Sequence, residues 1–171
     1  FKERHFGLDY PQLEYAKAIQ KNELPENIEV FEFYFQAGSL LHKNQAQRKY
    51  ISLNYTHVAQ SVYEQDVQVL ICMIAKHPEK QGLYSLSCNP DLTLDVSDLY
   101  HKNHKKLLIV VVVHPDLLYM AEDAEVPERF FDVIVESSEI KHKLFALPRE
   151  RVSLTDYMIG LQASMLLPDG G

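Results

Sequence analysis

The sequence predicts an α/β fold with an open, mostly parallel sheet flanked by helices. Two observations support this fold class. Apolar and β-branched runs of strand length alternate with segments of helical periodicity, and a repeated strand, turn and helix order is typical of a parallel sheet. In addition, residues 107–113 are apolar throughout, as expected of a central parallel strand that helices cover on both faces.

The first third of the chain is predicted to hold a leading helix and two strand–turn–helix units. The leading helix is expected to end near Asn22. Aromatic and β-branched residues gather at 28–35 and again at 50–53, so we expect a strand at each. A turn at 37–39 leads from the first strand to a helix, and the second strand leads to a helix from Val58 onward.

The remaining elements follow from the same patterns. Residues 67–74 predict a buried strand, and the alternating run 83–87 predicts another. Asn89 suits the N-cap of the next helix, with Pro90 at its first position. Residues 130–135 are strand-like and are expected to extend the sheet.

The two ends of the chain indicate a piece of a longer protein. Ser153 and Asp156 have capping-box spacing and predict a last helix. The chain opens at Phe1 without an initiator Met, and it stops at the turn signal 168–171, which we expect to lead into a second half. No Pro/Gly/Ser linker interrupts the sequence, so we expect residues 1–171 to form one domain.

Composition excludes several classes of function. The 24 acidic and 17 basic residues give a net charge of -7, which opposes binding to nucleic acid. The longest apolar run, 107–113, is far shorter than the roughly 20 residues that a membrane span needs. The only cysteines, Cys72 and Cys88, lie in apolar or strand-like stretches, so we expect buried thiols and a cytoplasmic protein without disulfides.

Three loops are candidates for ligand binding, because ligands gather where the strands of an open parallel sheet end. They are residues 37–39, 54–57 and 87–91. Each also has a structural interpretation, as a tight turn, a capping turn with a structural His, and a plain N-cap. The substrate-binding candidates in these loops are Gly38, Ser39, Asn54, Thr56, Ser87 and Asn89.

Other reactive residues fit structural roles better. Cys88 lies at a helix start, where a thiol pKa falls, but the sequence offers it no paired base. His101 and His104 lie in a Lys-rich loop without the further ligands of a zinc site. The acidic cluster at 122–125 is interpreted as a solvated loop. We therefore expect no metal and assign no catalytic residue.

Three longer segments, residues 32–39, 50–60 and 84–95, together resemble the acetyl-CoA hydrolase/transferase family. Residues 113–120 and 157–171 support the resemblance. The family has the fold shared by CoA-transferases and sugar-phosphate isomerases. The chain departs from the family pattern at His114, where members commonly have Asn, and at Val111 and Val112, where members have a Gly-Gln step.

The resemblance implies CoA transfer through a covalent glutamyl-CoA thioester, with coenzyme A as substrate rather than bound cofactor. The family's glutamate and its glycine-rich oxyanion loop belong to the second half, so this chain resembles the N-terminal half and is expected to be inactive alone. Implied partners are acyl-CoA, a small carboxylate or water, and the missing C-terminal half; a homo-oligomer is compatible. The alternative is a non-catalytic ligand-sensing or assembly domain on an isomerase-like α/β fold.

Overall fold

The computed structural model describes residues 13–34, 40, 42–88, 90–139, 143–144 and 152–167, apart from the side chain at position 45. The helices are α2 (Glu14–Lys21), α3 (Asn44–Arg48), α4 (Val58–Glu64), α5 (Pro90–Lys102) and α6 (Leu154–Ser164). Short 3-10 turns span Tyr55–His57, Glu122–Ala124 and Glu128–Phe130. The strands are β1 (Val69–Lys76), β2 (Leu83–Ser85), β3 (Leu108–Val113), β4 (Glu125–Pro127) and β5 (Val133–Val135).

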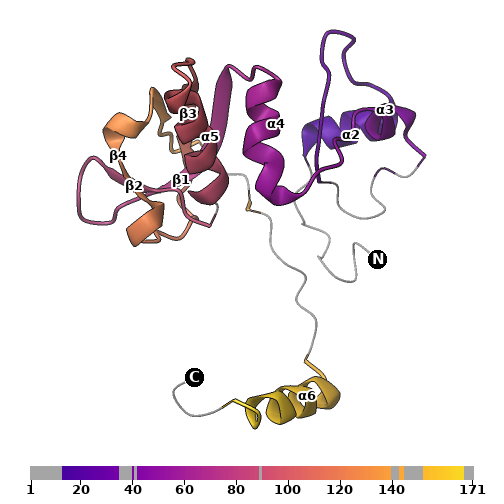
Figure 1. Cartoon of the computed structure of the whole chain (residues 1–171), viewed down its shortest axis with the longest axis vertical. Helices are drawn as coiled ribbons and strands as arrows, with labels where there is room; N and C mark the ends of the chain where they lie inside the picture. The colour runs from indigo at the N-terminus through magenta and orange to yellow at the C-terminus, as the bar shows by residue number, and fades with distance from the viewer. Residues whose placement is uncertain are drawn as a thin grey trace. The chain divides into compact units, whose positions relative to one another are not determined.

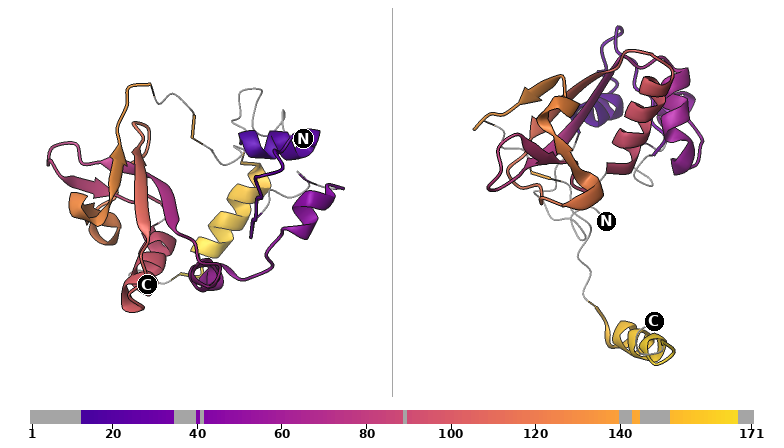
Figure 2. Two further views of the ribbon diagram at one scale, coloured as in Figure 1. Left: turned by 90° about the horizontal axis from the view of Figure 1, so that it is seen from above. Right: turned by 60° about the vertical axis from the view of Figure 1, so that its left-hand side comes forward.

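The five strands form one open sheet in the order β4-β2-β1-β3-β5 (Figures 1 and 2). Strands β1, β3 and β5 are parallel, with Ile71 opposite Val110 and Val111 opposite Ile134. Strand β2 pairs antiparallel with both β1 and β4. The predicted fold class, an open and mostly parallel sheet flanked by helices, is confirmed, and β3 lies inside the sheet as expected.

The two strands predicted nearest the N-terminus are wrong within the described residues. Residues 28–34 and 50–53 make a single parallel bridge, between Glu32 and Tyr50, instead of strands of the sheet. The bridge consists of the hydrogen bonds from Glu32 N–H to Lys49 O and from Ile51 N–H to Glu32 O. A β-branched and aromatic run favours extended backbone, but a strand also needs a partner over several residues.

Helices α4 and α5 lie side by side (Figure 1), which places both of their N-terminal ends together. Near their C-terminal ends the rings of Tyr63 and Tyr100 meet edge to face, with centroids 5.3 Å apart. The buried Tyr100 hydroxyl also donates to Val67 O at 2.5 Å, just before β1. Tyr100 therefore fixes both helices against the strand that follows α4.

One face of the parallel strands forms the core. Ile74 on β1 and Ile109, Val111 and Val113 on β3 are buried there, and Leu94 of α5 packs against this cluster. The alternation of side chains along each strand sends the intervening residues to the opposite face. The α5 side of the sheet thus supplies the main hydrophobic core of the described residues.

The opposite face is apolar and open to solvent, so the expectation that helices cover both faces of residues 107–113 is wrong for the described chain. Ile71 is 67% exposed and Leu108 is 42% exposed. Exposure on this side extends across the parallel strands to Val133 and Val135. An all-apolar sequence indicates only that a strand can be buried on both faces; it does not provide the covering element.

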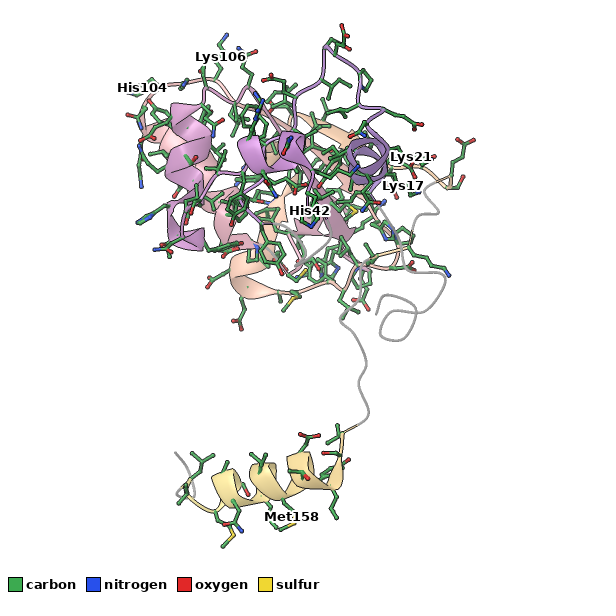
Figure 3. All side chains as sticks on the ribbon, turned by 90° about the vertical axis from the view of Figure 1, so that its right-hand side faces the viewer. Lys17, Lys21, His42, His104, Lys106 and Met158 are labelled. Atoms are coloured by element: carbon green, nitrogen blue, oxygen red, sulfur yellow. The ribbon has the colours of Figure 1, made fainter. Side chains whose placement is uncertain are left out.

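Helix α6 belongs to a different unit from the sheet, which lies with α2 to α5 in residues 12–144. Its predicted capping box is confirmed: Ser153 Oγ accepts the Asp156 N–H at 3.2 Å, and Asp156 Oδ2 accepts the Ser153 N–H at 2.7 Å. The apolar side chains of α6, including Met158 (Figure 3), are exposed. Among the described helices, α6 included, none is long and apolar enough to cross a membrane.

Candidate functional site

A pocket of about 590 Å³ opens at the carboxyl edge of the parallel strands β1, β3 and β5. Each strand contributes a polar residue: Lys76 is the last residue of β1, and His114 and Glu136 directly follow β3 and β5. Ligands of open α/β sheets bind at this edge, in pockets of this size. The wall is completed by Val113, Pro115, Leu117, Ser137 and Ser138.

Lys76 and Glu136 form an ion pair at this edge. The ammonium Nζ lies 2.9 Å from Glu136 Oε1 and 2.9 Å from Oε2. The hydrogen bond to Glu136 raises the pKa of Lys76, so the ammonium is charged at neutral pH. The two side chains are 45% and 54% exposed, so water screens their attraction and the pair adds little to stability.

His114 lines the pocket from the turn after β3, and it is buried, with 1% of its surface exposed. The backbone N–H of His114 donates to Ile74 O at 3.0 Å. This bond extends the pairing of β1 and β3 by one hydrogen bond. Its ring Nδ1 accepts the backbone N–H of Asp116 at 3.2 Å. His114 therefore holds the turn that follows β3.

Two buried serines connect the end of β2 to the segment beyond this turn. Ser85 Oγ donates to Met120 O at 2.6 Å and accepts the N–H groups of Met120 and Ser87 at 3.1 and 3.0 Å. Ser87 has a left-handed backbone (φ 59), and its Oγ donates to Leu118 O at 3.0 Å. Ser87 is 3% exposed, so its hydroxyl has a structural partner, and its role as a substrate contact stays a prediction.

Two of the three predicted loops meet at the N-terminal ends of α4 and α5. Tyr55 OH donates to Asp91 Oδ1 at 3.4 Å across 36 positions of sequence. Asn54 and Thr56, which flank Tyr55, are exposed beside this contact, as is Cys88 just before α5. Burial, followed by the charge of Asp91, raises the pKa of Tyr55, so its phenol stays protonated at neutral pH.

The described residues before the first predicted loop lie close to the second loop. The ring centroids of Phe33 and Tyr55 are 6.2 Å apart, so the segment that leads toward residues 37–39 passes next to the second loop. Gly38 and Ser39 themselves lie outside the described residues, and so does Asn89 in the third loop. Their substrate-binding roles stay predictions.

The cysteines and the His-rich loop have ordinary surroundings. Cys72 is half-buried and burial raises its thiol pKa, whereas Cys88 is exposed, so the expectation of two buried thiols is wrong for Cys88. His104 and Lys106 project from the loop between α5 and β3 (Figure 3). Over the described parts of the chain, His, Cys, Asp and Glu form no group of three that could hold a metal ion.

The acidic cluster at 122–125 is only partly a solvated loop. Glu122 and Asp123 are exposed, but Glu125 begins β4, is half-buried and accepts a hydrogen bond from Tyr119 OH. The ring of Tyr119 also packs edge to face on His77, with centroids 4.7 Å apart. Because Glu125 is half-buried and pairs with Ser85 of β2, the interpretation as a solvated loop is wrong for this residue.

The Tyr119 contact predicts a loss of stability at alkaline pH. Burial, followed by the Glu125 hydrogen bond, raises the pKa of Tyr119 from 10.0 to about 12. Unfolded chains release this proton near pH 10.0 but folded chains keep it, so the stabilisation is lost progressively between pH 10.0 and about 12. Urea unfolding at pH 9 to 12 should show a smaller alkaline loss in Tyr119→Phe than in the parent.

Tyr34→Phe is the matched control, because Tyr34 is 76% exposed. It should follow the parent chain across the same pH range. An equal alkaline loss in the parent and in Tyr119→Phe would mean that the Tyr119 hydroxyl does not contribute.

Sequence reasoning missed Lys76 and Glu136 as site residues. Glu136 directly follows the predicted strand 130–135, and Lys76 lies between the predicted strands 67–74 and 83–87. The sequence does contain a signal for these two site residues. Lys76 and Glu136 are the first polar residues after predicted parallel strands, and ligands bind at the carboxyl ends of such strands.

No protein-family model matches this sequence, and no curated protein matches it either. Solved structures do match. RipA from Yersinia pestis is 18% identical, with a TM-score of 0.59 over 91% of this chain and 36% of that chain. A RipA mutant is 16% identical, with a TM-score of 0.63 over 94% of this chain and 37% of that chain.

A 4-hydroxybutyrate CoA-transferase from Porphyromonas gingivalis gives a TM-score of 0.49 at 18% identity, over 91% of this chain and 38% of that chain. The chain thus spans little more than a third of the length of these proteins. At such low identities the RipA likeness shows fold alone. The described sheet and helices therefore have a fold similar to the corresponding part of RipA.

Proposed function

We propose that this chain is the N-terminal, substrate-binding domain of an acyl-CoA hydrolase or CoA-transferase. One observation carries the proposal. Residues 50–60 and 84–95, two of the segments that resemble the acetyl-CoA hydrolase/transferase family, meet at the Tyr55–Asp91 contact. A sequence resemblance that converges on one place in a compatible fold is stronger than the fold alone, because function resides in sites.

In the proposed enzyme, this domain positions the acyl-CoA and its carboxylate acceptor, and a glutamate outside the chain forms the glutamyl-CoA thioester. Asn54 and Thr56 offer an amide and a hydroxyl on the exposed side of the α4 turn. Asn89 and the N-terminal N–H groups of α5 offer donors for an acyl or pantetheine oxygen. Coenzyme A is the substrate, and the chain's own residues bind and orient it.

Calorimetric titration of the chain with acetyl-CoA tests the proposal. The parent is expected to bind, and Thr56→Ala should weaken binding at least tenfold, which corresponds to about 1.4 kcal/mol. Thr155→Ala is the matched control, because Thr155 is an exposed threonine of α6, and it should bind like the parent. Absence of acetyl-CoA binding, or equal affinity of all three chains, would contradict the proposed site.

A second expectation concerns turnover. The chain alone should neither hydrolyse acetyl-CoA nor transfer CoA, because the proposed nucleophile is not among its residues. Release of free CoA, followed with a thiol reagent, is the measurement. Thioester turnover that persists through independent purifications would show that a residue of this chain carries the chemistry.

The exposed apolar face of the sheet favours one alternative, a non-catalytic ligand-sensing or assembly domain. Ile71, Val133 and Val135 on this face are each more than 40% exposed. Contiguous apolar surface of this kind is typical of protein interfaces. A chain that self-associates in light scattering and shows no affinity for acetyl-CoA would favour this alternative over the enzyme.

A further inference from the structure

We propose that His77 is a pH-sensitive switch in the connection between β1 and β2. The neutral imidazole ring holds residues 77–80 in a closed turn, and a proton on the ring opens this turn in mildly acidic solution. The connection directly follows Lys76, which lines the pocket at the carboxyl edge of the parallel strands. The inference does not depend on acyl-CoA binding and goes beyond the proposed function.

The ring of His77 closes the turn by accepting two backbone hydrogen bonds. The N–H groups of Glu79 and Lys80 donate to its Nδ1 at 3.0 and 2.9 Å. An imidazole nitrogen accepts hydrogen bonds only while it carries no proton. Protonation of Nδ1 would replace both bonds by contacts between N–H groups, so the turn can no longer stay closed.

Contacts outside the turn fix the ring in this position. The ring of Tyr119 packs edge to face on His77, with centroids 4.7 Å apart, and the Tyr119 hydroxyl donates to Glu125 on β4. The backbone N–H of His77 donates to Leu83 O at 3.1 Å. His77 itself is half-buried, so solvent protons reach the ring while the sheet stays folded.

The charges around the connection permit a proton on His77. The described titratable groups of the turn and of the elements that contact it are Glu79, Glu125, Glu128, Tyr119, Lys76 and Lys80. Three of them are carboxylates, two are ammonium groups and one is a phenol, so a charged imidazole meets no excess of positive charge. Histidine is the side chain that ordinarily changes its charge between about pH 5 and 8.

A second histidine at the same edge provides a comparison within the chain. Both β1 and β3 are followed directly by His, Pro and an acidic residue, at 77–79 and 114–116. The Nδ1 atom of His114 likewise accepts the N–H of the acidic residue, at 3.2 Å. His114 is 1% exposed, whereas His77 is half-buried. Of these two similar turns, the one after β1 is therefore open to solvent protons in the folded chain.

The opening is expected to be local. Strand β2 is held by its pairing with both β1 and β4. Gly82, which has a left-handed backbone (φ 70), is held at the far end of the connection, where its carbonyl accepts the Glu128 N–H at 2.9 Å. None of these bonds involves the His77 ring, so protonation should free residues 78–81 and leave the sheet intact.

The experiment follows NMR signals of the 171-residue chain between about pH 8 and 5. The amide protons of Glu79 and Lys80 should shift with the same midpoint as the ring signals of His77. Their protection against exchange, relative to an unfolded chain at the same pH, should fall at least tenfold at the acidic end. His101→Asn is the matched control, because His101 is an exposed histidine of α5, and it should respond like the parent.

Two variants of His77 separate a switch from a structural residue. His77→Asn should keep the turn closed and abolish its pH response, because an asparagine oxygen can accept the same N–H groups at every pH. His77→Ala should leave the turn open throughout the range, with low protection of Glu79 and Lys80. Circular dichroism should report the same secondary structure for all chains at both ends of the range.

Several results would overturn the inference. One is a His77 ring that titrates while the Glu79 and Lys80 amides keep their protection, and another is a ring that does not titrate in this range. A pH response that persists in His77→Asn would assign it to another group. A loss of secondary structure in the parent between the two ends of the range would replace the local opening by acid unfolding.

Discussion

Replacing Ile74 with alanine is expected to lower the free energy of unfolding by about 2–5 kcal/mol. Ile74 is 0% exposed on the α5 side of β1, so truncation removes packing and leaves a cavity in the main core. The same substitution at Ile71, three positions earlier on the same strand, should change stability by about 0.5 kcal/mol or less, because Ile71 is 67% exposed. Urea unfolding followed by circular dichroism measures both.

Both variants replace an isoleucine of β1 with alanine. The difference between their unfolding free energies therefore reports only which face of the sheet is covered. Equal losses at the two positions would contradict the exposed face, and would show that another surface covers β1 in solution. Repeating the unfolding at several protein concentrations identifies self-association as that cover, because stability then depends on concentration.

The second large effect is expected from Ser85→Ala. Ser85 is 0% exposed, and its single oxygen serves Ser87 N–H, Met120 N–H and Met120 O. Alanine leaves these groups without that partner, and each unsatisfied buried group costs about 1–3 kcal/mol. We expect a total loss of about 2–4 kcal/mol in unfolding free energy, since some of the groups will find water or shift.

Ser61→Ala is the control for this variant. Ser61 Oγ accepts a hydrogen bond from Gln65 at 3.3 Å on the exposed side of α4, where water can replace the lost partner. Its unfolding free energy should stay within about 0.5 kcal/mol of the parent. If Ser85→Ala costs no more than Ser61→Ala, the serine does not hold the segment through Met120 to the end of β2.

Local chemistry determined several elements that the structure confirms. The capping box of Ser153 and Asp156 starts α6 as predicted, because both partners lie within three residues. The helix from Pro90 and the helix from Val58 are also confirmed, since apolar periodicity and a favourable first position are local features.

Pairing between strands was less predictable. Residues 28–34 and 83–87 both read as strands, yet only the second joins the sheet, as the antiparallel strand β2. Strand direction and partner choice depend on how the chain returns. The short connection between β1 and β2, closed by the His77 N–H bond to Leu83 O, enforces a hairpin rather than a parallel crossover.

The candidate site also has features that the sequence predicts and contacts that it does not predict. The sequence indicated the loops around Asn54 and Thr56 and the start of α5, because polar residues follow strand-like runs there. It did not indicate that Tyr55 meets Asp91, nor that Ser87 turns inward to Leu118 O. These contacts join positions more than 30 residues apart, so they follow from the packing of elements rather than from local pattern.

The sequence by itself determined the fold class, the strand 107–113 inside the sheet, and the resemblance that suggests CoA chemistry. Only the tertiary structure decided that none of the described helices of the sheet's own unit covers the second face of that strand, and that Lys76, His114 and Glu136 gather at one edge. The physical reason is that helical and strand periodicity report the preference of a segment for burial. The partner that satisfies this preference is set by the register of β1, β3 and β5, which brings three distant strand ends together.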